Sequence, residues 1–182
     1  MPLTDRRRFM STVAVALPAL MAPPVAFGRP TVDLEPVRAL QFEHLHTGER
    51  LAVEYVAGGE YLPDALTSVN RLLRDFRTGD VYPIDRNLLD LLHRLTRLTE
   101  THRPFQVISG YRSPATNAML RSRSEGVAAH SLHMEGMAID IRLADVPLPA
   151  LRQAAVEAAG GGVGFYRASN FVHVDTGRIR AW

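Results

Sequence analysis

Two short stretches, Met137-Ala-Ile-Asp-Ile-Arg142 and Phe171-Val-His-Val-Asp175, decide the fold and the place of the candidate site. In a β-strand, successive side chains point to opposite faces of the sheet. Each stretch therefore has one aliphatic face, and each turns a metal-competent side chain the other way. These side chains are Asp140 and His173. If the two strands lie in one sheet, the carboxylate and the imidazole converge on one point.

A third metal-competent side chain, His133, lies seven residues before Asp140 in the sequence. Gly136, between the two, lets the chain fold back. Two imidazoles and one carboxylate leave the fourth position of a tetrahedral zinc ion for water, which is the composition of a catalytic site. The chain has no cysteine, so a thiolate zinc site and a disulfide are excluded. The spacing alone is common by chance, and a helix cap or a surface pair is the alternative interpretation.

The rest of the sequence predicts an α+β fold. Alternation of apolar residues predicts strands, and apolar residues at helical spacing predict helices. Because helices come early and most strands late, we expect a central antiparallel sheet that carries the metal site on one face and helices on the other. Leu98 is expected to point inward from its helix and His44 to be solvated. The expected strands span residues 37–43, 50–56, 105–110, 137–143, 163–166 and 171–175, and the expected helices span residues 64–76, 85–100, 114–122 and 149–159.

The N-terminal residues 1–28 have the pattern of an export signal. Three consecutive arginines, Arg6 to Arg8, precede an apolar stretch and a small-residue exit, and their arrangement with Phe9 resembles a twin-arginine signal. Pro18 interrupts the short apolar stretch, so we expect no stable membrane span. The prediction is a mature domain over residues 29–182 that is located in the periplasm.

The charge balance argues against nucleic-acid binding. The chain has 21 basic and 19 acidic residues. Residues 1–28 hold three of the basic and one of the acidic residues, so 18 of each remain in the predicted mature domain. A formally neutral domain offers no basic stripe to a phosphate backbone. The sequence does not indicate an oligomeric state.

Several motifs, in a fixed order, resemble those of the murein endopeptidase K-like family. The pattern Ser131-x-His133-x-x-Gly136-x-Ala138-x-Asp140, followed by a strand with His173, is similar to the signature of the zinc D-Ala-D-Ala peptidases. That superfamily also includes lysostaphin-type endopeptidases and hedgehog domains. The other matching segments are His46-Thr-Gly-Glu49, Ile108-Ser-Gly-Tyr-Arg-Ser113, Gly161-Gly-Val-Gly-Phe-Tyr166, Asn170-Phe-Val-His-Val-Asp-Thr-Gly177 and Trp182.

The resemblance implies a hedgehog-like or D-Ala-D-Ala peptidase-like fold in which His133, Asp140 and His173 bind Zn²⁺. It implies hydrolysis of peptidoglycan cross-links by a zinc-activated water. Arg112 matches a superfamily residue that faces the substrate, where a guanidinium binds a carboxylate or stabilises an oxyanion. A structural salt bridge is the alternative role for this arginine.

The general base does not carry over from the resembling families. Asn170 and Phe171 stand where relatives place an acid or a histidine. Asp175 shares a strand face with His173, so it either orients that imidazole or accepts the proton. His130 and Glu135 lie near the first metal ligand, and the sequence does not choose between them.

Two other functions fit the same residues. One is a D-Ala-D-Ala carboxypeptidase that trims stem peptides, and the other is a peptidoglycan-binding module that does not hydrolyse.

Overall fold

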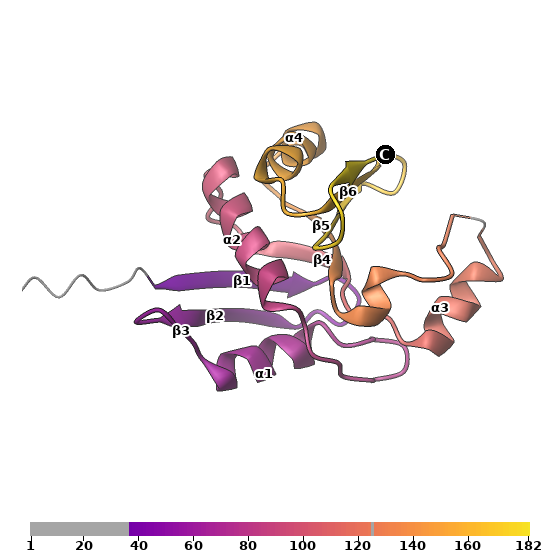
Figure 1. The fold of residues 1–182 in the computed structure, drawn as a ribbon, viewed down its shortest axis with the longest axis horizontal. Coiled ribbons are helices and arrows are strands. Elements are labelled where there is room, and N and C mark those ends of the chain that lie inside the picture. The colour runs from indigo at the N-terminus through magenta and orange to yellow at the C-terminus, as the bar shows by residue number, and fades with distance from the viewer. Residues whose placement is uncertain (1–36, 125) are drawn as a thin grey trace, which may run out of the picture. The chain divides into compact units, whose positions relative to one another are not determined.

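The computed structural model describes residues 37–124 and 126–182, which form an α+β fold around one sheet (Figure 1). The sheet has eight strands in the order β3-β2-β1-β4-β5-β7-β6-β8. The strands are β1 (Arg38–His44), β2 (Arg50–Ala57), β3 (Glu60–Tyr61), β4 (Phe105–Ser109), β5 (Ala138–Arg142), β6 (Gly162–Tyr166), β7 (Phe171–Asp175) and β8 (Arg180–Ala181). The helices are α1 (Pro63–Leu72), α2 (Arg86–Thr99), α3 (Pro114–Arg121) and α4 (Leu148–Ala158), with a 3₁₀ helix η1 (Leu132–Glu135).

The sheet is mixed, so the expectation of an antiparallel sheet is wrong in part. Most neighbours are antiparallel, but β1 pairs with β4 and β6 pairs with β8 in parallel. A parallel pair needs a long crossover. Between β1 and β4 the chain supplies it with β2, β3, α1 and α2. Local sequence patterns do not reveal which distant strands become neighbours.

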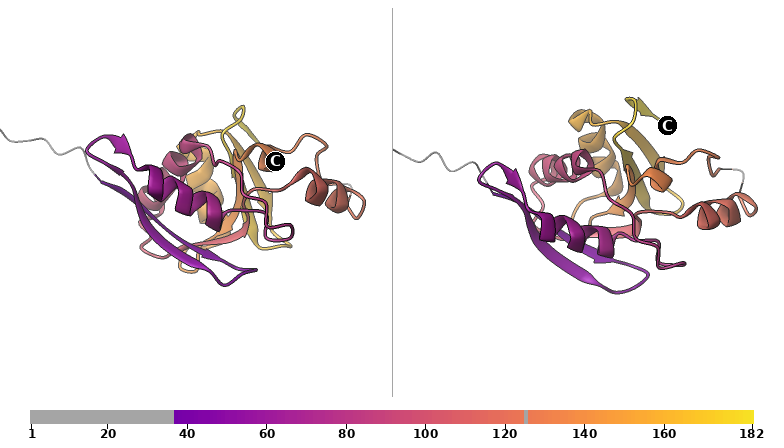
Figure 2. Two further views of the ribbon diagram at one scale, coloured as in Figure 1. Left: turned by 90° about the horizontal axis from the view of Figure 1, so that it is seen from below. Right: turned by 60° about the horizontal axis from the view of Figure 1, so that its bottom comes forward.

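Helices α1, α2 and α4 pack on one face of the sheet. Helix α1 contacts β2, α2 contacts β1 and α4, and α4 contacts β6 and β7. Helix α3 stands apart from them, at the other end of the molecule from β3 (Figure 2). The aliphatic side chains of β5 and β7, such as Ile139, Ile141 and Val174, belong to the same core as the leucines of α2. The opposite face of these strands is therefore left for Asp140 and His173.

Helix α2 begins where the sequence predicts. Asp85 is its N-cap, and the carboxylate accepts a hydrogen bond from Asn87 N at 3.0 Å. Its leucines at positions 88, 89, 91, 92 and 95 are buried. The expectation for Leu98 is wrong, because this residue lies in the last turn, beyond the sheet contact, and is 42% exposed.

The expectation for His44 is also wrong. This side chain is fully buried at the end of β1. Its ring lies 5.5 Å from the ring of Phe76, edge-on. Burial, the largest cause, lowers the pKa of His44. The histidine is thus part of the packing beneath the β1–β2 turn.

Helix α1 ends four residues earlier than expected, because the following residues hold the loop that precedes α3. Leu73 O accepts a hydrogen bond from Tyr111 N at 2.7 Å. The Asp75 carboxylate accepts hydrogen bonds from Ser113 N and Arg77 N, both at 2.9 Å. Leu73 and Asp75 therefore fix the loop that contains Arg112.

We expect Asp75→Asn to destabilise the fold in a pH-dependent way. Burial raises the pKa of Asp75, but hydrogen bonds from Thr116, Ser113 and Arg77 outweigh it and lower the pKa to about 2 from 3.8. The folded state therefore gains stability from this carboxylate above about pH 4 and loses the gain as the pH falls through about 2. The variant should lose about 2 kcal/mol of unfolding free energy at pH 7. Urea denaturation between pH 2 and 7 measures this, and a pH-independent difference would contradict the assignment.

Two further expectations, the export signal and the lack of a stable membrane span in its apolar stretch, concern residues 1–28 and stay predictions. The predicted signal, residues 1–28, lies outside the residues that the structure describes. In the described ranges, no helix is both long and apolar enough to cross a membrane.

Candidate metal centre

Three elements bring His133, Asp140 and His173 together. His133 comes from η1, Asp140 from β5 and His173 from β7. Strands β5 and β7 pair so that Asp140 lies directly opposite His173. One ligand atom from each of the three residues lies within 4.8 Å of the other two, and all three side chains are buried. The convergence inferred from the alternation of the two strands is therefore present.

Gly136 positions the first histidine. It ends η1 in the left-handed region at φ 67°. A Cβ at this position would lie 2.2 Å from Pro83 O. Both the backbone angle and the close approach therefore require glycine. The chain can then turn from η1 into β5 within a few residues.

The distances fit a divalent cation. His133 Nε2 lies 3.2 Å from His173 Nδ1, and Asp140 Oδ1 lies 3.3 Å and 2.9 Å from these two atoms. Ligands about 2.0–2.1 Å from a tetrahedral zinc ion lie about 3.3 Å from one another. The triangle of ligand atoms thus needs little adjustment to hold an ion of this size.

Hydrogen bonds on the outer side of each imidazole orient the rings. His133 Nδ1 lies 2.7 Å from Gly110 O, and His173 Nε2 lies 3.1 Å from Asp175 Oδ2. Since these oxygens only accept, each ring donates a proton outward, and its inner nitrogen is the one that would bind a metal ion. Such outward hydrogen bonds fix the orientation of histidine rings that bind a metal ion.

The electrostatics of the centre also favour positive charge. Burial lowers the pKa of His173, but Asp140 and Asp175 outweigh it and raise the pKa to about 9. Burial also opposes ionisation of Asp140, yet His133 and His173 hold its pKa below its usual range. The two carboxylates flank the His173 ring from opposite sides and so stabilise positive charge on or beside it.

Asp175 has both carboxylate oxygens occupied. Oδ1 accepts hydrogen bonds from Gly162 N, Gly177 N and Arg180 Nη1 at 2.8, 2.9 and 3.1 Å. Oδ2 accepts from Arg180 Nη2 at 2.7 Å and from His173. The side chain is fully buried. It lies behind the imidazole, on the side away from the other two ligands.

Arg112 lies beside the metal ligands. Its Nη2 is 3.7 Å from Asp140 Oδ2, and its backbone N donates to His133 O at 3.1 Å. Burial lowers the pKa of Arg112, with Asp140 opposing this, but a guanidinium stays charged at neutral pH. Its Nε is buried and has no hydrogen-bond partner within the described part of the chain. The terminal nitrogens of Arg112 therefore lie within reach of a ligand bound next to Asp140.

A hollow of about 380 Å³ opens over the centre. The three ligands and Arg112 line it, and so does His130, whereas Glu135 does not. The structure thus distinguishes His130 from Glu135, between which the sequence does not choose. The remaining lining includes Tyr166, Phe171, Arg180 and Trp182.

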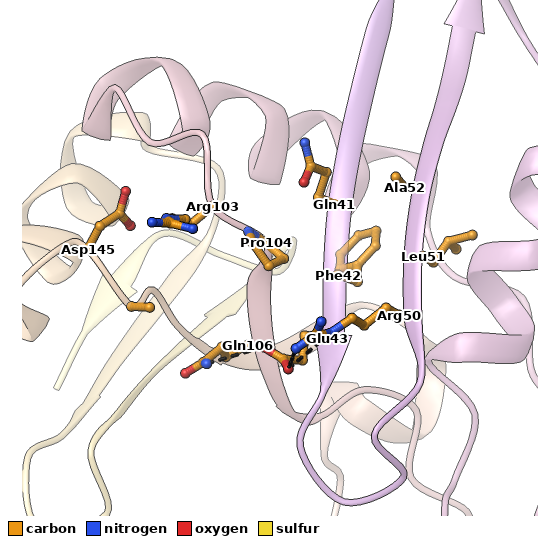
Figure 3. Close-up of a pocket in the computed structure, with 11 residues that line it drawn as sticks. Gln41, Phe42, Glu43, Arg50, Leu51, Ala52, Arg103, Pro104, Gln106 and Asp145 are labelled. Carbon is orange, nitrogen blue, oxygen red and sulfur yellow. Dashed lines mark hydrogen bonds and ion pairs between the residues drawn. The ribbon is translucent and has the colours of Figure 1, made fainter.

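A larger hollow of about 580 Å³ lies elsewhere on the sheet (Figure 3). Glu43 and Arg50 form an ion pair of 2.6 Å there, and Gln106 donates to Glu43 at 3.3 Å. None of the three metal ligands lines this hollow. These three polar side chains are paired with one another, so size alone does not make this hollow the site.

Sequence reasoning missed two parts of the centre. The carbonyl of Gly110 carries no sequence signal, because every residue has one. Arg180 lies in a two-residue strand that is too short for a periodic pattern.

The chain resembles known proteins over almost all of its length. A family model described as peptidoglycan L,D-endopeptidase MepK matches residues 33–182. The peptidoglycan L,D-endopeptidase MepK of Escherichia coli (strain K12) is 42% identical over 178 residues, covering 98% of this chain and 97% of that protein. The probable peptidoglycan L,D-endopeptidase MepK of Haemophilus influenzae is 39% identical over 179 residues, covering 98% and 95%. The family inferred from the motifs is confirmed: this chain belongs to the peptidoglycan L,D-endopeptidase MepK family.

Proposed function

We propose that this chain is a zinc-dependent endopeptidase that hydrolyses the peptide cross-links of peptidoglycan. The observation that carries the proposal is the triangle of His133, Asp140 and His173 ligand atoms beneath an open hollow. The names of the two relatives support the substrate class. The signal pattern of residues 1–28 supports a periplasmic location reached by the twin-arginine route.

The donor set favours zinc. Two imidazole nitrogens and one carboxylate oxygen suit zinc better than magnesium or calcium, which prefer oxygen ligands. Zinc bound here would polarise the scissile carbonyl and make a water nucleophilic near neutral pH. The outward hydrogen bonds of His133 and His173 would leave the inner nitrogens of both rings free to bind the ion. A water molecule or a peptide carbonyl would reach it from the hollow.

Arg112 is proposed to stabilise the oxyanion of the tetrahedral intermediate. Its guanidinium is largely buried, lies next to Asp140 and has an unpartnered Nε. A fixed and largely buried cation stabilises developing negative charge more than one in solution.

We therefore expect Arg112→Ala to lower kcat by about 10²-fold. KM should change less, and the zinc content should stay that of the wild type because Arg112 is not a ligand. Steady-state kinetics on a cross-linked muropeptide dimer, with zinc analysis of the same sample, measures this. The variant Arg103→Ala is the control, because this arginine does not line the hollow over the metal centre. A raised KM with an unchanged kcat would contradict the oxyanion role.

His130 is proposed as the proton acceptor. It lines the hollow, and histidine is the side chain that most often serves as a general base. Asp175 is proposed only to orient His173, because both of its oxygens are already hydrogen-bonded and the ring separates it from the open position. Glu135 is exposed and does not line the hollow.

The products released from defined muropeptides test the proposed function. The purified domain, from residue 29, is incubated with a cross-linked dimer and with an uncross-linked pentapeptide stem. An endopeptidase converts the dimer to monomers and leaves the pentapeptide intact. Release of free D-alanine from the pentapeptide alone would establish the carboxypeptidase alternative. Retention of both substrates by a zinc-loaded protein that binds sacculi would establish a binding module.

A further inference from the structure

Trp182 is a half-exposed aromatic side chain beside the metal centre. Its ring lies 5.5 Å from the ring of His173, and it lines the hollow over the metal ligands. It is 49% exposed. An exposed aromatic ring that lines a hollow over the candidate metal centre is suited to contact a ligand there.

Several contacts hold the ring in place. Trp182 Nε1 donates to Tyr166 Oη at 3.1 Å. Its backbone N donates to Val163 O at 3.1 Å, and its O accepts from Phe165 N at 3.0 Å. The guanidinium of Arg180 lies 4.8 Å from the ring centroid. Because the ring is already ordered, a ligand that packs on it loses little further entropy.

A glycine makes room for this arrangement. Gly164 in β6 lies directly opposite His173 in β7. A Cβ on Gly164 would come within 2.8 Å of the rings of both Trp182 and Tyr166. Only a residue without a side chain therefore lets the two rings lie over β6, next to the second histidine ligand.

The aromatic surface extends beyond Trp182. Tyr166 stacks on Phe171 with ring centroids 4.6 Å apart, and both residues line the hollow. Arg112 lines the same hollow. The hollow thus combines an apolar aromatic wall with a buried cation, which suits a ligand that has a hydrocarbon chain close to an anionic group.

We propose that Tyr166, Phe171 and Trp182 form a subsite for the aliphatic side chain of the diamino acid residue in the stem peptide. The inference rests on the proposed function, because peptidoglycan stems supply such residues. The subsite determines which residue lies next to the scissile bond, and its effect is on binding rather than on the chemical step.

The fluorescence of Trp182 tests the subsite directly, because it is the sole tryptophan of the chain. The zinc-loaded domain is titrated with an uncross-linked tetrapeptide stem that contains diaminopimelate. We expect a saturable shift of the emission to shorter wavelength as the ring is covered. A tetrapeptide with alanine in place of diaminopimelate should give little shift. Calorimetrically detected binding of the stem without any change in emission would overturn the subsite.

Kinetics give an independent readout. Trp182→Leu should raise KM for the cross-linked dimer about tenfold, with kcat within about threefold and an unchanged zinc content. Ile179→Ala, which removes a 72% exposed side chain outside the hollow, should change neither constant. A joint fall of kcat, zinc content and Tm in Trp182→Leu would instead indicate a merely structural role.

The experiments distinguish a failure of the aromatic subsite from a failure of the proposed endopeptidase function. A saturable emission shift without hydrolysis of the dimer would remove the endopeptidase function and keep the subsite. Hydrolysis by the wild type, with KM unchanged in Trp182→Leu, would remove the subsite and keep the function.

Discussion

Replacing His133 by alanine is expected to abolish tight metal binding and to lower endopeptidase activity by about 10³-fold. The side chain supplies one of three protein ligands, and its outer nitrogen is held by Gly110 O at 2.7 Å. Without it, the centre keeps only the imidazole of His173 and the carboxylate of Asp140. Loss of the several kcal/mol that a metal ion contributes to a transition state corresponds to a rate effect of this order.

Zinc analysis after gel filtration and the rate of dimer cleavage measure the effect of His133→Ala. His102→Ala, which changes an exposed histidine between α2 and β4, provides the matched control and should keep both zinc and activity. A His133→Ala protein that retains one zinc ion per chain would contradict the assignment of this ligand.

Asp175→Asn is expected to lower zinc affinity between about tenfold and 100-fold, which is the effect of losing an outer-shell partner of a metal ligand. The amide keeps the size of the carboxylate but removes its charge. Arg180 then loses its ionic partner, so we also expect about 2 kcal/mol less unfolding free energy. This is less than for a fully buried pair, because the side chain of Arg180 is 32% exposed.

Competition with a chromogenic chelator measures the zinc affinity of Asp175→Asn. Asp64→Asn, in the exposed first turn of α1, is the control. The same experiment separates the two roles weighed for Asp175. An orienting residue changes zinc affinity, whereas a general base changes kcat at full zinc occupancy. Wild-type zinc affinity with a large loss of kcat would therefore contradict the positioning role.

The central part of the site could be predicted from the sequence because its pattern is local. Strand alternation alone separates Asp140 and His173 from the aliphatic residues on either side of them. Pairing of the two strands then places one opposite the other. The third ligand, His133, is suggested only by a spacing that is common by chance, and the family motif singles it out, since a 3₁₀ turn has no periodic signature.

The other features depend on contacts between distant segments. The parallel pairing of β1 with β4 joins residues about 60 positions apart, and no local pattern encodes it. The early end of α1 reflects the contact of Leu73 with Tyr111. The sequence predicts a solvated His44, but Phe76, which is distant in the sequence, packs against its ring. Such contacts decide burial, and they appear only once the chain is folded.

Metal-dependent cleavage of a defined cross-linked dimer tests the central claim most directly. The zinc-loaded domain, a chelator-treated sample and a sample resupplied with zinc are incubated with the dimer, and the products are separated by chromatography and mass. The proposed function predicts monomers in the first and third samples and intact dimer in the second. Equal cleavage in all three samples, or no cleavage by a folded protein with one zinc ion per chain, would contradict it.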